Sequence, residues 1–405
     1  MSEWSIAGKG ILTPDKFVKK ASILVSDGII DKIDGRSSFS IEVDGIIVPG
    51  LINSHDHLLG TYHPKVGNGP YENWLPWDND LKSSPIYEER QQIENRDLYL
   101  LGGYRNLLSG VTTVSDHIPH FVNEPFIDIL PVKALKNYAL AHAVVSFALA
   151  WGDGITLEYQ KAAKEHIPFI THSGEGFDDE TRHDIDTLER LGALGEYTVL
   201  IHGIAFNEQD IKRIKKAGAS VVWCGDSNMY MFNRTANVKL MLEHGVNVCI
   251  GTDSPMSGGE NLLYEIKFDR KLYKKLFGQE LSDETIVKMI TVNPSYAFKL
   301  HDHGAIKPGN VADFIVISRM EDNPYSAVVN AQLEDIALVV INGKPMYGDS
   351  SYKKLFDHNK VKYQEIILRN RHKLVVGDLL GLLRRISKAV GYKKEFPFIP
   401  VEFDI

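Results

Sequence analysis

The chain has 405 residues, of which 43% are hydrophobic, and its formal net charge is −8. This length can supply one large domain with a buried core and a smaller second domain. The negative charge argues against nucleic acid as the main partner, because no net positive field would attract phosphate groups.

The cysteines and the N-terminus indicate the environment of the protein. Its two cysteines, Cys224 and Cys249, lie inside apolar runs, which favours reduced thiols in a core over a disulfide framework. No basic segment followed by an apolar one opens the chain, and no run approaches the roughly 20 apolar residues of a membrane span. We therefore expect a soluble, cytoplasmic protein that acts on a small molecule and has no membrane partner.

Both terminal segments are predicted to form strands. Residues 4–48 alternate short β-rich runs with turn signals at Asp27-Gly28 and Asp34-Gly35, which is typical of a small antiparallel sheet. Two further apolar runs lie between residues 304 and 347. We expect residues 1–48 and 304–347 to pair into one small β-sandwich domain outside the main body.

The run from residue 46 to 53 is rich in β-branched residues and predicts a buried strand, which His55 and His57 follow. Alternate side chains of an extended chain share a face, so these two imidazoles point the same way, as two ligands of one metal ion must. Two partly exposed loop histidines would show the same pattern. The residues at the ends of the other predicted strands therefore distinguish a metal site from a pair of loop histidines.

Residues 60–90 interrupt the periodic pattern with tryptophans, tyrosines and several prolines. A loop of this length in a compact domain is usually functional or disordered. Because it leaves directly from the end of the His55/His57 strand, we expect an ordered aromatic flap over that end, with Trp74 and Trp77 as candidate substrate contacts. The alternative is that the tryptophans only hold the loop against the main domain.

Candidate strands alternate with helical patterns over residues 49–303, as in a parallel sheet with crossover helices. We expect an α/β fold of the (β/α)8 TIM-barrel type over this range. The sequence supplies one strand fewer than such a barrel needs, and strands 3 and 4 are poorly placed. Strands are expected at residues 46–53, 111–116, 139–147, 169–172, 198–202, 220–224 and 246–251.

Polar residues follow three more of these strands. His172 and Glu175 come at the end of one, His202 ends the next, and Asp253 follows the last. In a parallel barrel all strand C-termini emerge on one face, so these side chains can converge with His55 and His57. Each one alone could be a strand cap or a turn carboxylate. Their occurrence together, each directly after an apolar strand, predicts a shared site.

The segment 348–405 is expected to be a helical tail of mixed charge. Residues 379–386 form an amphipathic stripe. The stripe suits packing on the barrel or against a second copy of the chain in a homodimer.

These motifs resemble the amidohydrolase superfamily, specifically its mononuclear branch, which includes cytosine, guanine, adenosine and S-adenosylhomocysteine deaminases and triazine hydrolases. The resemblance covers most of residues 1–345. It rests on Pro49–His57, on His172 with Glu175, on His202-Gly203, on Gly251–Ser254 and on the segment from Gly304 to Asp313.

The resemblance implies a role for each of these residues. His55, His57, His172 and Asp253 would bind the metal ion, while Glu175, His202 and Asp253 would serve the chemistry. Superfamily members with two metal ions bridge them through a modified lysine on strand 4. No lysine stands at a plausible strand-4 end of this chain, which favours one ion.

The residue types also suit these roles on chemical grounds. Three imidazoles and a carboxylate suit Zn²⁺, or alternatively Fe²⁺, and leave a position for water. Glu175 could take the proton of that water and pass it to a leaving nitrogen, while His202 polarises the substrate. Asp253 could both touch the metal ion and orient the attacking hydroxide.

Two further residues are candidate substrate contacts. Asn228 lies in a segment where superfamily members often show Cys-Pro-x-Ser-Asn, although Gly225 replaces the proline here and predicts a looser loop. His117 follows strand 2 on the functional face, where a loop histidine with its hydrogen bonds satisfied is an equal alternative.

The first functional interpretation is a metal-dependent hydrolytic deaminase of a small nitrogen heterocycle, such as a purine, pyrimidine, triazine or pterin-like ring. Alternatives on the same site are a cyclic amide hydrolase, acting for example on an imidazolone, and a hydrolase that removes a chloro or alkylamino substituent, because hydroxide adds to an sp² carbon in each case. A barrel that has kept its fold without catalysis is the alternative from a different class. The complete set of candidate metal ligands argues against it.

Overall fold

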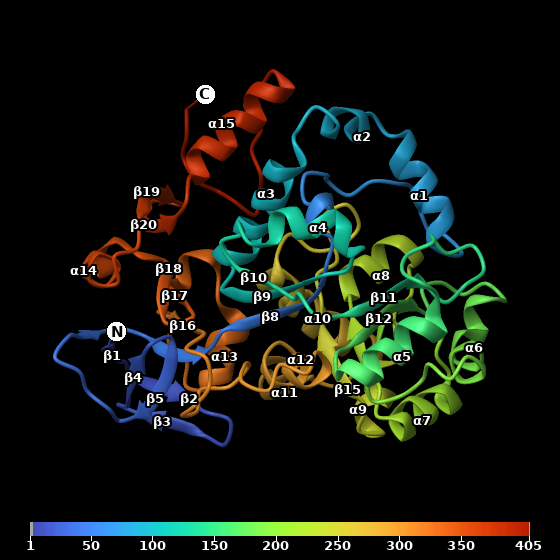
Figure 1. Ribbon diagram of the computed structural model, residues 1–405, viewed down its shortest axis with the longest axis horizontal. Coiled ribbons are helices and arrows are strands. Elements are labelled where there is room, and N and C mark those ends of the chain that lie inside the picture. Colours follow the sequence, from blue (N-terminus) through green and yellow to red (C-terminus); the bar gives the residue numbers. More distant parts are fainter. Residues whose placement is uncertain (1–2, 405) are drawn as a thin grey trace.

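The computed structural model describes residues 3–404. Its central part consists of two parallel sheets whose strands alternate with helices along the chain (Figure 1). One sheet has the order β10-β9-β8 and the other the order β11-β12-β13-β14-β15. The predicted α/β class with parallel strands is confirmed. The strands are β8 (Leu51–Asp56), β9 (Val111–Asp116), β10 (Lys133–Ala134), β11 (Ala139–Ala143), β12 (Phe169–Ser173), β13 (Thr198–His202), β14 (Ser220–Trp223) and β15 (Asn247–Ile250).

Two strands differ from the sequence prediction. The strand that the sequence does not predict is β10, which is two residues long and therefore too short to show a periodic pattern. The run predicted as one strand over 46–53 is divided at Gly50 into β7 (Ile46–Pro49) and β8. Pro49 lacks the N–H that would continue the ladder, and a side chain at Gly50 would collide with Thr112.

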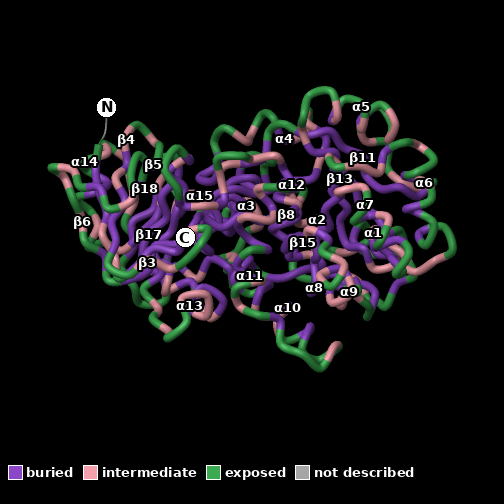
Figure 2. Tube along the Cα trace, turned by 90° about the horizontal axis from the view of Figure 1, so that it is seen from below, coloured by how far each residue is buried: buried purple, intermediate pink, exposed green. Residues whose placement is uncertain are grey.

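The crossover helices bury apolar faces against these sheets, and the strands form the buried interior (Figure 2). The helix α7 (Glu208–Ala217) shows why they form. Asn207 and Asp210 make a capping box at its start, Ile211 and Ile214 are buried, and Gly218 ends it in the left-handed conformation with φ at 75°. The other helices of this part are α3 (Asn95–Leu108), α4 (His120–Ile127), α5 (Ile155–Glu165), α6 (Asp184–Arg190), α8 (Gly225–Phe232), α9 (Val238–Glu243), α10 (Leu262–Phe277), α11 (Asp283–Met289) and α12 (Val292–Ala297).

Strands from both ends of the chain share one sheet beside this central part. It has the order β19-β20-β18-β17-β16-β7-β2-β3, and a four-stranded sheet has the order β5-β4-β1-β6. The pairs β2–β7 and β1–β6 are parallel, unlike the antiparallel pairing expected for the N-terminal segment. The N-terminal strands are β1 (Glu3–Ala7), β2 (Gly10–Leu12), β3 (Phe17–Lys19), β4 (Ser22–Ser26), β5 (Ile29–Ile33) and β6 (Ser40–Glu42), and the C-terminal ones are β16 (Phe314–Ile317), β17 (Ile336–Ile341) and β18 (Lys344–Asp349) with the hairpin described next. The helix α13 (Pro324–Asn330) lies between β16 and β17 in the chain.

The segment after residue 348 is not the helical tail that the sequence predicts. It contains α14 (Lys353–His358) and α15 (Leu379–Val390), but also the hairpin β19 (Tyr363–Leu368) and β20 (Arg371–Val376), which extends the sheet along β18. The turn residues Arg369 and Asn370 have φ values of 44° and 65°. A two-residue turn with both φ positive normally carries Asn-Gly, so this hairpin has no clear sequence signal.

The amphipathic stripe of α15 is buried within the chain. Leu379, Leu382, Leu383 and Ile386 are covered, and Arg385 pairs with Asp97 of α3 through Nη2 and Oδ1 at 2.9 Å. The stripe therefore gives no support to a dimer, and the homodimer stays a prediction.

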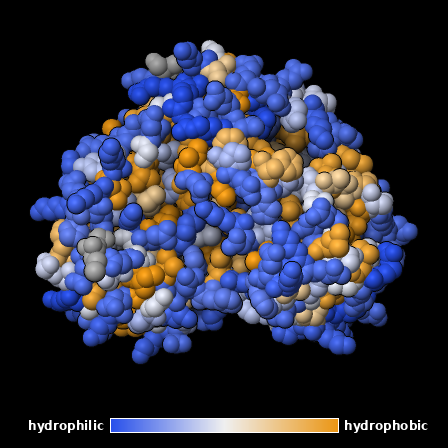
Figure 3. Space-filling view, in the orientation of Figure 1, coloured by the Kyte–Doolittle hydropathy of each residue, from blue (hydrophilic) through white to orange (hydrophobic). Residues whose placement is uncertain are grey.

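The segment 60–90 forms two helices, α1 (Trp74–Ser83) and α2 (Pro85–Arg90), at one edge of the molecule (Figure 1). Trp74 and Trp77 pack with Tyr71 and Leu81 against residues 231–232 of α8. Hydrophilic side chains cover most of the face shown in Figure 3, and hydrophobic ones form separate patches between them. Within residues 3–404, no helix has both the length and the apolar character that a membrane crossing needs.

Candidate active site

Parallel pairing brings the predicted polar residues to the same ends of the strands. His55 lies near the end of β8, His172 near the end of β12, and His202 is the last residue of β13, while Asp253 follows β15. His202 and Asp253 have φ values of 79° and 52°, in the left-handed region that non-glycine residues rarely adopt. Backbone strain of this kind clusters at functional sites, where the surrounding structure holds it in place.

The side chains of these residues form one cluster. Three overlapping groups each have ligand atoms within 4.8 Å of one another: His55 with His57 and His172, His55 with His202 and Asp253, and His172 with Glu175 and His202. Oδ1 of Asp253 is 3.8 Å from Nε2 of His55 and 3.7 Å from Nε2 of His57. These spacings leave room for one small cation between the imidazoles and the carboxylate.

His55 shows most directly that a cation fits here. Its side chain is fully buried, and neither ring nitrogen has a hydrogen-bond partner among the residues of 3–404. Leaving buried polar atoms without partners costs about 1–3 kcal/mol each. A metal ion bound by the ring would supply the missing interaction, and the imidazole and carboxylate donors suit Zn²⁺.

Burial controls the protonation of the cluster. It lowers the pKa of His55, His172 and His202, with neighbouring histidines adding to the effect at His55 and His172. These rings are therefore neutral and present lone pairs. Burial alone would raise the pKa of the Asp253 carboxyl, but the facing His57 and His202 and the Ser227 hydroxyl hold it below its usual range.

Hydrogen bonds orient two of the imidazoles. Nδ1 of His172 donates to the His142 carbonyl oxygen at 2.6 Å, and Nδ1 of His202 donates to Oδ1 of Asn228 at 2.8 Å. Both arrangements leave Nε2 as the free nitrogen that faces the cluster. Nε2 of His202 lies 3.6 Å from Oε1 of Glu175. Asn228 therefore orients His202 through the Nδ1 side of its ring.

Three serines hold the Asp253 carboxylate. Oδ2 accepts hydrogen bonds from the hydroxyls of Ser227 at 2.7 Å and Ser257 at 3.0 Å, while Oδ1 accepts one from the Ser254 amide at 2.8 Å. The Asp253 amide donates to the His55 carbonyl oxygen at 3.0 Å. The first and last strands of the central part are therefore tied together at the site.

A buried ion pair below the cluster was not predicted from the sequence. Nη1 of Arg105 donates to both carboxylate oxygens of Asp56 at 2.9 Å, and its other nitrogens donate to the carbonyls of Gly259 and Glu260 at 2.8 and 2.7 Å. Asp56, the last residue of β8, stands between His55 and His57, so this pair fixes the end of β8 against the loop after Asp253. The helix α3 is buried on almost every side, so no periodic pattern distinguishes Arg105.

A pocket with a volume of about 260 Å³ opens beside the cluster. His57, His172, Glu175, His202 and Asp253 line it, and most of its wall is apolar, with Trp74 and Trp77 among the lining residues. His117 and Asn228, the other predicted substrate contacts, do not line it; His117 is buried and its Nε2 donates to the Ala141 carbonyl oxygen at 3.1 Å. The remaining wall is formed by Leu59, Gly60, His63, Asp78, Leu81, Tyr87, Arg90, Ile118, His142, Leu149, Trp151, Met231 and Met256.

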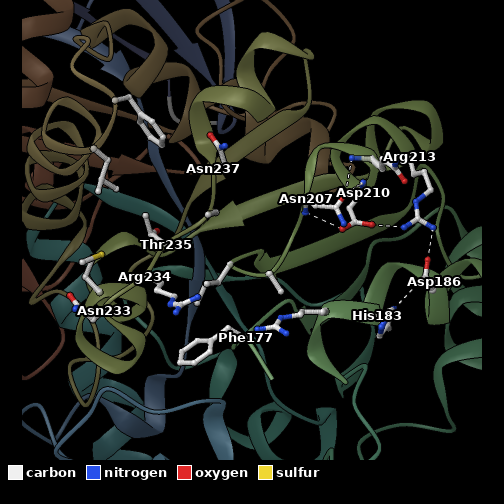
Figure 4. A pocket seen from close by; sticks show the side chains of 18 residues that line it. Phe177, His183, Asp186, Asn207, Asp210, Arg213, Asn233, Arg234, Thr235 and Asn237 are labelled. Carbon is white, nitrogen blue, oxygen red and sulfur yellow. Dashed lines mark hydrogen bonds and ion pairs between the residues drawn. The ribbon is translucent and has the colours of Figure 1, made fainter. Parts of the chain in front are cut away.

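A larger pocket of about 880 Å³ lies at the surface between the helices after β12, β13 and β14 (Figure 4). Several of its charged side chains pair with one another: Arg213 pairs with Asp186 at 2.7 Å and also with Asp210, whose carboxylate belongs to the cap of α7. Among residues 3–404, none of the His/Asp/Glu clusters of the kind found around His55 includes a residue of this pocket. The side chains that line the two pockets, and not the pocket volumes, therefore identify the smaller pocket as the candidate active site.

Comparisons with known proteins agree with the predicted resemblance. The family model described as "Amidohydrolase family" matches residues 153–346. A 5-methylthioadenosine/S-adenosylhomocysteine deaminase from Pyrococcus furiosus is 24% identical over 84% of this chain and 94% of its own length.

Two solved structures share the fold. A triazine hydrolase from Arthrobacter aurescens is 17% identical, covers 96% of this chain and 100% of its own, and superimposes with a TM-score of 0.76. An adenosine deaminase from Xanthomonas campestris with bound zinc is 18% identical, covers 85% of this chain and 92% of its own, and has a TM-score of 0.67. At these identities the two structures support the fold of the chain and nothing more specific.

Proposed function

We infer that this chain, an amidohydrolase by its match over residues 153–346 and its similarity to curated deaminases, is a metal-dependent hydrolase that deaminates a small nitrogen heterocycle. The observation that carries the proposal is the cluster of His55, His57, His172 and Asp253 beside Glu175 and an apolar pocket. We propose an amino-purine as the first substrate class, because the similar protein from Pyrococcus furiosus is named for two adenine nucleosides.

We propose that His55, His57, His172 and Asp253 hold one divalent ion, Zn²⁺ in preference to Fe²⁺. The unpartnered nitrogens of His55 and the neutral state of the rings support this assignment. Strand β11 reads Ala-Leu-Ala-His-Ala and carries no lysine that could bridge a second ion. When bound, such an ion lowers the pKa of water from about 15.7 to about 7 and so supplies hydroxide at neutral pH.

Glu175 is proposed to move the proton. Burial raises the pKa of its carboxyl well above the usual range, and the charges of Asp253 and Asp184 add to this. A carboxyl of this kind holds a proton more readily than an exposed one, so it can accept a proton from water and deliver it to the leaving nitrogen. The carbon–nitrogen bond breaks, a carbon–oxygen bond takes its place, and ammonia leaves.

His202 and Asp253 are proposed to position the water and the ring. Asn228 keeps a proton on Nδ1 of His202, so Nε2 of the neutral ring accepts a hydrogen bond. In this state His202 orients the attacking water, and it polarises the substrate only after it has taken up a proton. The three serine contacts fix the direction of the Asp253 carboxylate.

Trp74 and Trp77 are proposed to contact the substrate ring. Nε1 of Trp77 donates to the Val66 carbonyl oxygen at 2.9 Å, while Nε1 of Trp74 is buried without a partner among residues 3–404. An indole N–H can only donate. Trp74 therefore offers a hydrogen bond to an acceptor on the heterocycle.

We also propose that the two parallel sheets close into one (β/α)8 barrel over residues 49–303. The bond from the Asp253 amide to the His55 carbonyl and the Asn53 side-chain contacts with Thr252, at 2.9 and 3.1 Å, support contact between strands β8 and β15. The outer sheets are proposed to form a β-sandwich from residues 1–48 and 304–347. A shared apolar core, in which the rings of Trp4 and Phe314 are 6.1 Å apart, supports that assignment.

Ammonia release from zinc-loaded protein tests the proposed function. We expect turnover of at least one member of a panel of amino-purines, pyrimidines, triazines and pterins, beginning with 5'-methylthioadenosine. Turnover of cyclic amides with no ammonia from any amino-heterocycle would instead identify a cyclic amide hydrolase. Release of chloride or an alkylamine from triazines would identify a ring-substituent hydrolase.

A further inference from the structure

A histidine outside the metal-ligand cluster lines the active-site pocket, and its ring has no partner among residues 3–404. His63 is 4% exposed and lines the pocket, yet neither Nδ1 nor Nε2 makes a hydrogen bond with residues 3–404. Its ring stacks against Tyr87 of α2 with 6.2 Å between centroids. His63 is not one of the clustered metal-ligand candidates, so the ion proposed there does not account for its empty positions.

Arg90, the last residue of α2, lines the same pocket. It is partly buried, and within residues 3–404 no carboxylate lies within 4.0 Å of its guanidinium group. Its side chain makes only two hydrogen bonds with the described residues, and both are long, 3.5 Å to Gln91 and 3.3 Å to Asn95. A guanidinium group keeps its charge under these conditions, so a partly buried cation is left without an anion.

Two carboxylates that could balance Arg90, those of the pocket-lining Asp78 and of the preceding residue Glu89, are already paired. Asp78 accepts from Nζ of Lys82 at 2.6 Å, and Glu89 accepts from Lys394 at 3.1 Å. Neither carboxylate is left to balance Arg90. An anion that enters the pocket would therefore meet one unpaired positive charge.

The protonation of His63 is consistent with this arrangement. Burial lowers the pKa of its ring to about 4, a nearby carbonyl of Gly60 opposes the shift, and the positive charges of Arg90 and Lys394 add to it. Neutral His63 carries one N–H that can donate to a ligand. His63 and Arg90 line the same pocket, so one ligand there could contact both.

We propose that His63 and Arg90 form an anion-binding end of the substrate pocket, and that the substrate is a flat heterocycle with a carboxylate on the side opposite the bond that is broken. The proposal rests on the proposed function, because it assigns another part of that same site. Arg90 would bind the carboxylate as an ion pair, and His63 would donate one hydrogen bond. The apolar wall between the two ends would hold the ring.

The pocket volume limits the size of this substrate. Ligand sites for drug-sized molecules usually have volumes of about 300–1,000 Å³. The volume here is about 260 Å³, which suits a bicyclic ring with a short acidic substituent.

A matched pair of probes tests the proposal without turnover. We would measure the dissociation constants of benzimidazole and benzimidazole-5-carboxylate for the zinc-loaded protein by calorimetry. We expect the carboxylate to bind about 10- to 100-fold more tightly, the range of a hydrogen bond to a charged group. Arg90→Met should remove this preference and leave the affinity for benzimidazole unchanged, and His63→Phe should reduce it.

The control is Arg190→Met, which changes an exposed arginine of α6 that lines neither pocket described above. It should keep the full preference for the carboxylate. Equal or weaker binding of the carboxylate by the unmodified protein, no binding of either probe, or an equal loss of both probes in Arg90→Met would overturn the proposal. A carboxylate preference in a protein that releases no ammonia from any heterocycle would leave the anion-binding end standing and remove the proposed deamination.

Discussion

Glu175 is the residue on which the proposed chemistry depends most. Within residues 3–404 its carboxyl pairs with no lysine or arginine, and Oε1 lies 3.6 Å from Nε2 of the neutral His202 ring. A structural carboxylate buried to this degree would normally be paired. The arrangement leaves the group free to exchange a proton with a bound substrate.

Glu175→Gln keeps the shape of this side chain and removes its ability to carry the proton. We expect kcat to fall about 10²- to 10⁴-fold, the usual contribution of general acid–base catalysis. Bound zinc, measured by elemental analysis, should be unchanged. The matched variant Glu165→Gln alters an exposed glutamate at the end of α5 and should retain full activity. Near-normal turnover of Glu175→Gln would exclude it from proton transfer.

A second prediction at the scale of single residues concerns the buried ion pair of Arg105 and Asp56. Both side chains are almost fully buried, with 1% and 0% exposure. Removing one partner of such a pair leaves an uncompensated buried charge, which costs about 3–5 kcal/mol. We expect Arg105→Met to lower the free energy of unfolding by this amount, measured by denaturant titration. A loss below 1 kcal/mol would show that the pair does not support the strand of His55 and His57.

At the scale of elements, the start of α6 is coupled to the loop that carries Glu175. Oδ2 of Asp184, the first residue of α6, accepts a hydrogen bond from the Gly174 amide at 2.7 Å. Burial raises the pKa of Asp184 to about 7, and the hydrogen bond from Gly174 and the nearby Ser173 hydroxyl oppose that rise. The usual value of an aspartate in an unfolded chain is about 3.9.

This difference makes stability depend on pH. Because the folded-state pKa is raised, the contribution of Asp184 is fully present below about pH 4 and is lost as the pH rises toward 7, at up to about 1.4 kcal/mol per pH unit. We expect Asp184→Asn to become more stable relative to the unmodified protein over this range. Unfolding curves at pH 4.5, 5.5, 6.5 and 7.5 would measure it. A difference between the two proteins that does not change with pH would contradict the assignment.

The helix α15 is expected to stabilise the chain by packing on α3. Leu382 is fully buried, so Leu382→Ala should cost about 2–5 kcal/mol of unfolding free energy. Lys388→Ala, on the exposed side of the same helix, should be nearly neutral. Because the stripe is covered within the chain, neither variant should change the molecular mass in solution. A change of oligomeric state in Leu382→Ala alone would place α15 at an interface between copies.

At the scale of the whole molecule, most central strands were predictable because they are apolar runs, and several of these runs have a polar residue at their end. The segments ending at His172 and His202 show this most clearly. The two-residue β10 and the hairpin β19–β20 could not be predicted. The first is too short to show a hydrophobic pattern, and the turn of the second is Arg369-Asn370 in place of a turn that contains glycine. These elements are fixed by their neighbours in the sheets.

The residues that support the site also could not be predicted from the sequence. Arg105 and Ser257 matter because of what they contact, and His63 matters because its buried ring nitrogens have no partner among residues 3–404. Nothing in their local sequence pattern separates them from ordinary buried or loop residues. The residues proposed to bind the metal ion were predictable because their type and position both point to one function.

The central claim is that one divalent ion lies among His55, His57, His172 and Asp253. A crystal structure of the zinc-loaded protein, with anomalous data collected at the zinc edge, tests it most directly. We predict a single peak at about 2.0–2.1 Å from an imidazole nitrogen of each histidine and at about 2.0–2.2 Å from Asp253. No peak at this position, a peak that lacks His172 or Asp253 as a ligand, or two peaks sharing the site would contradict the account.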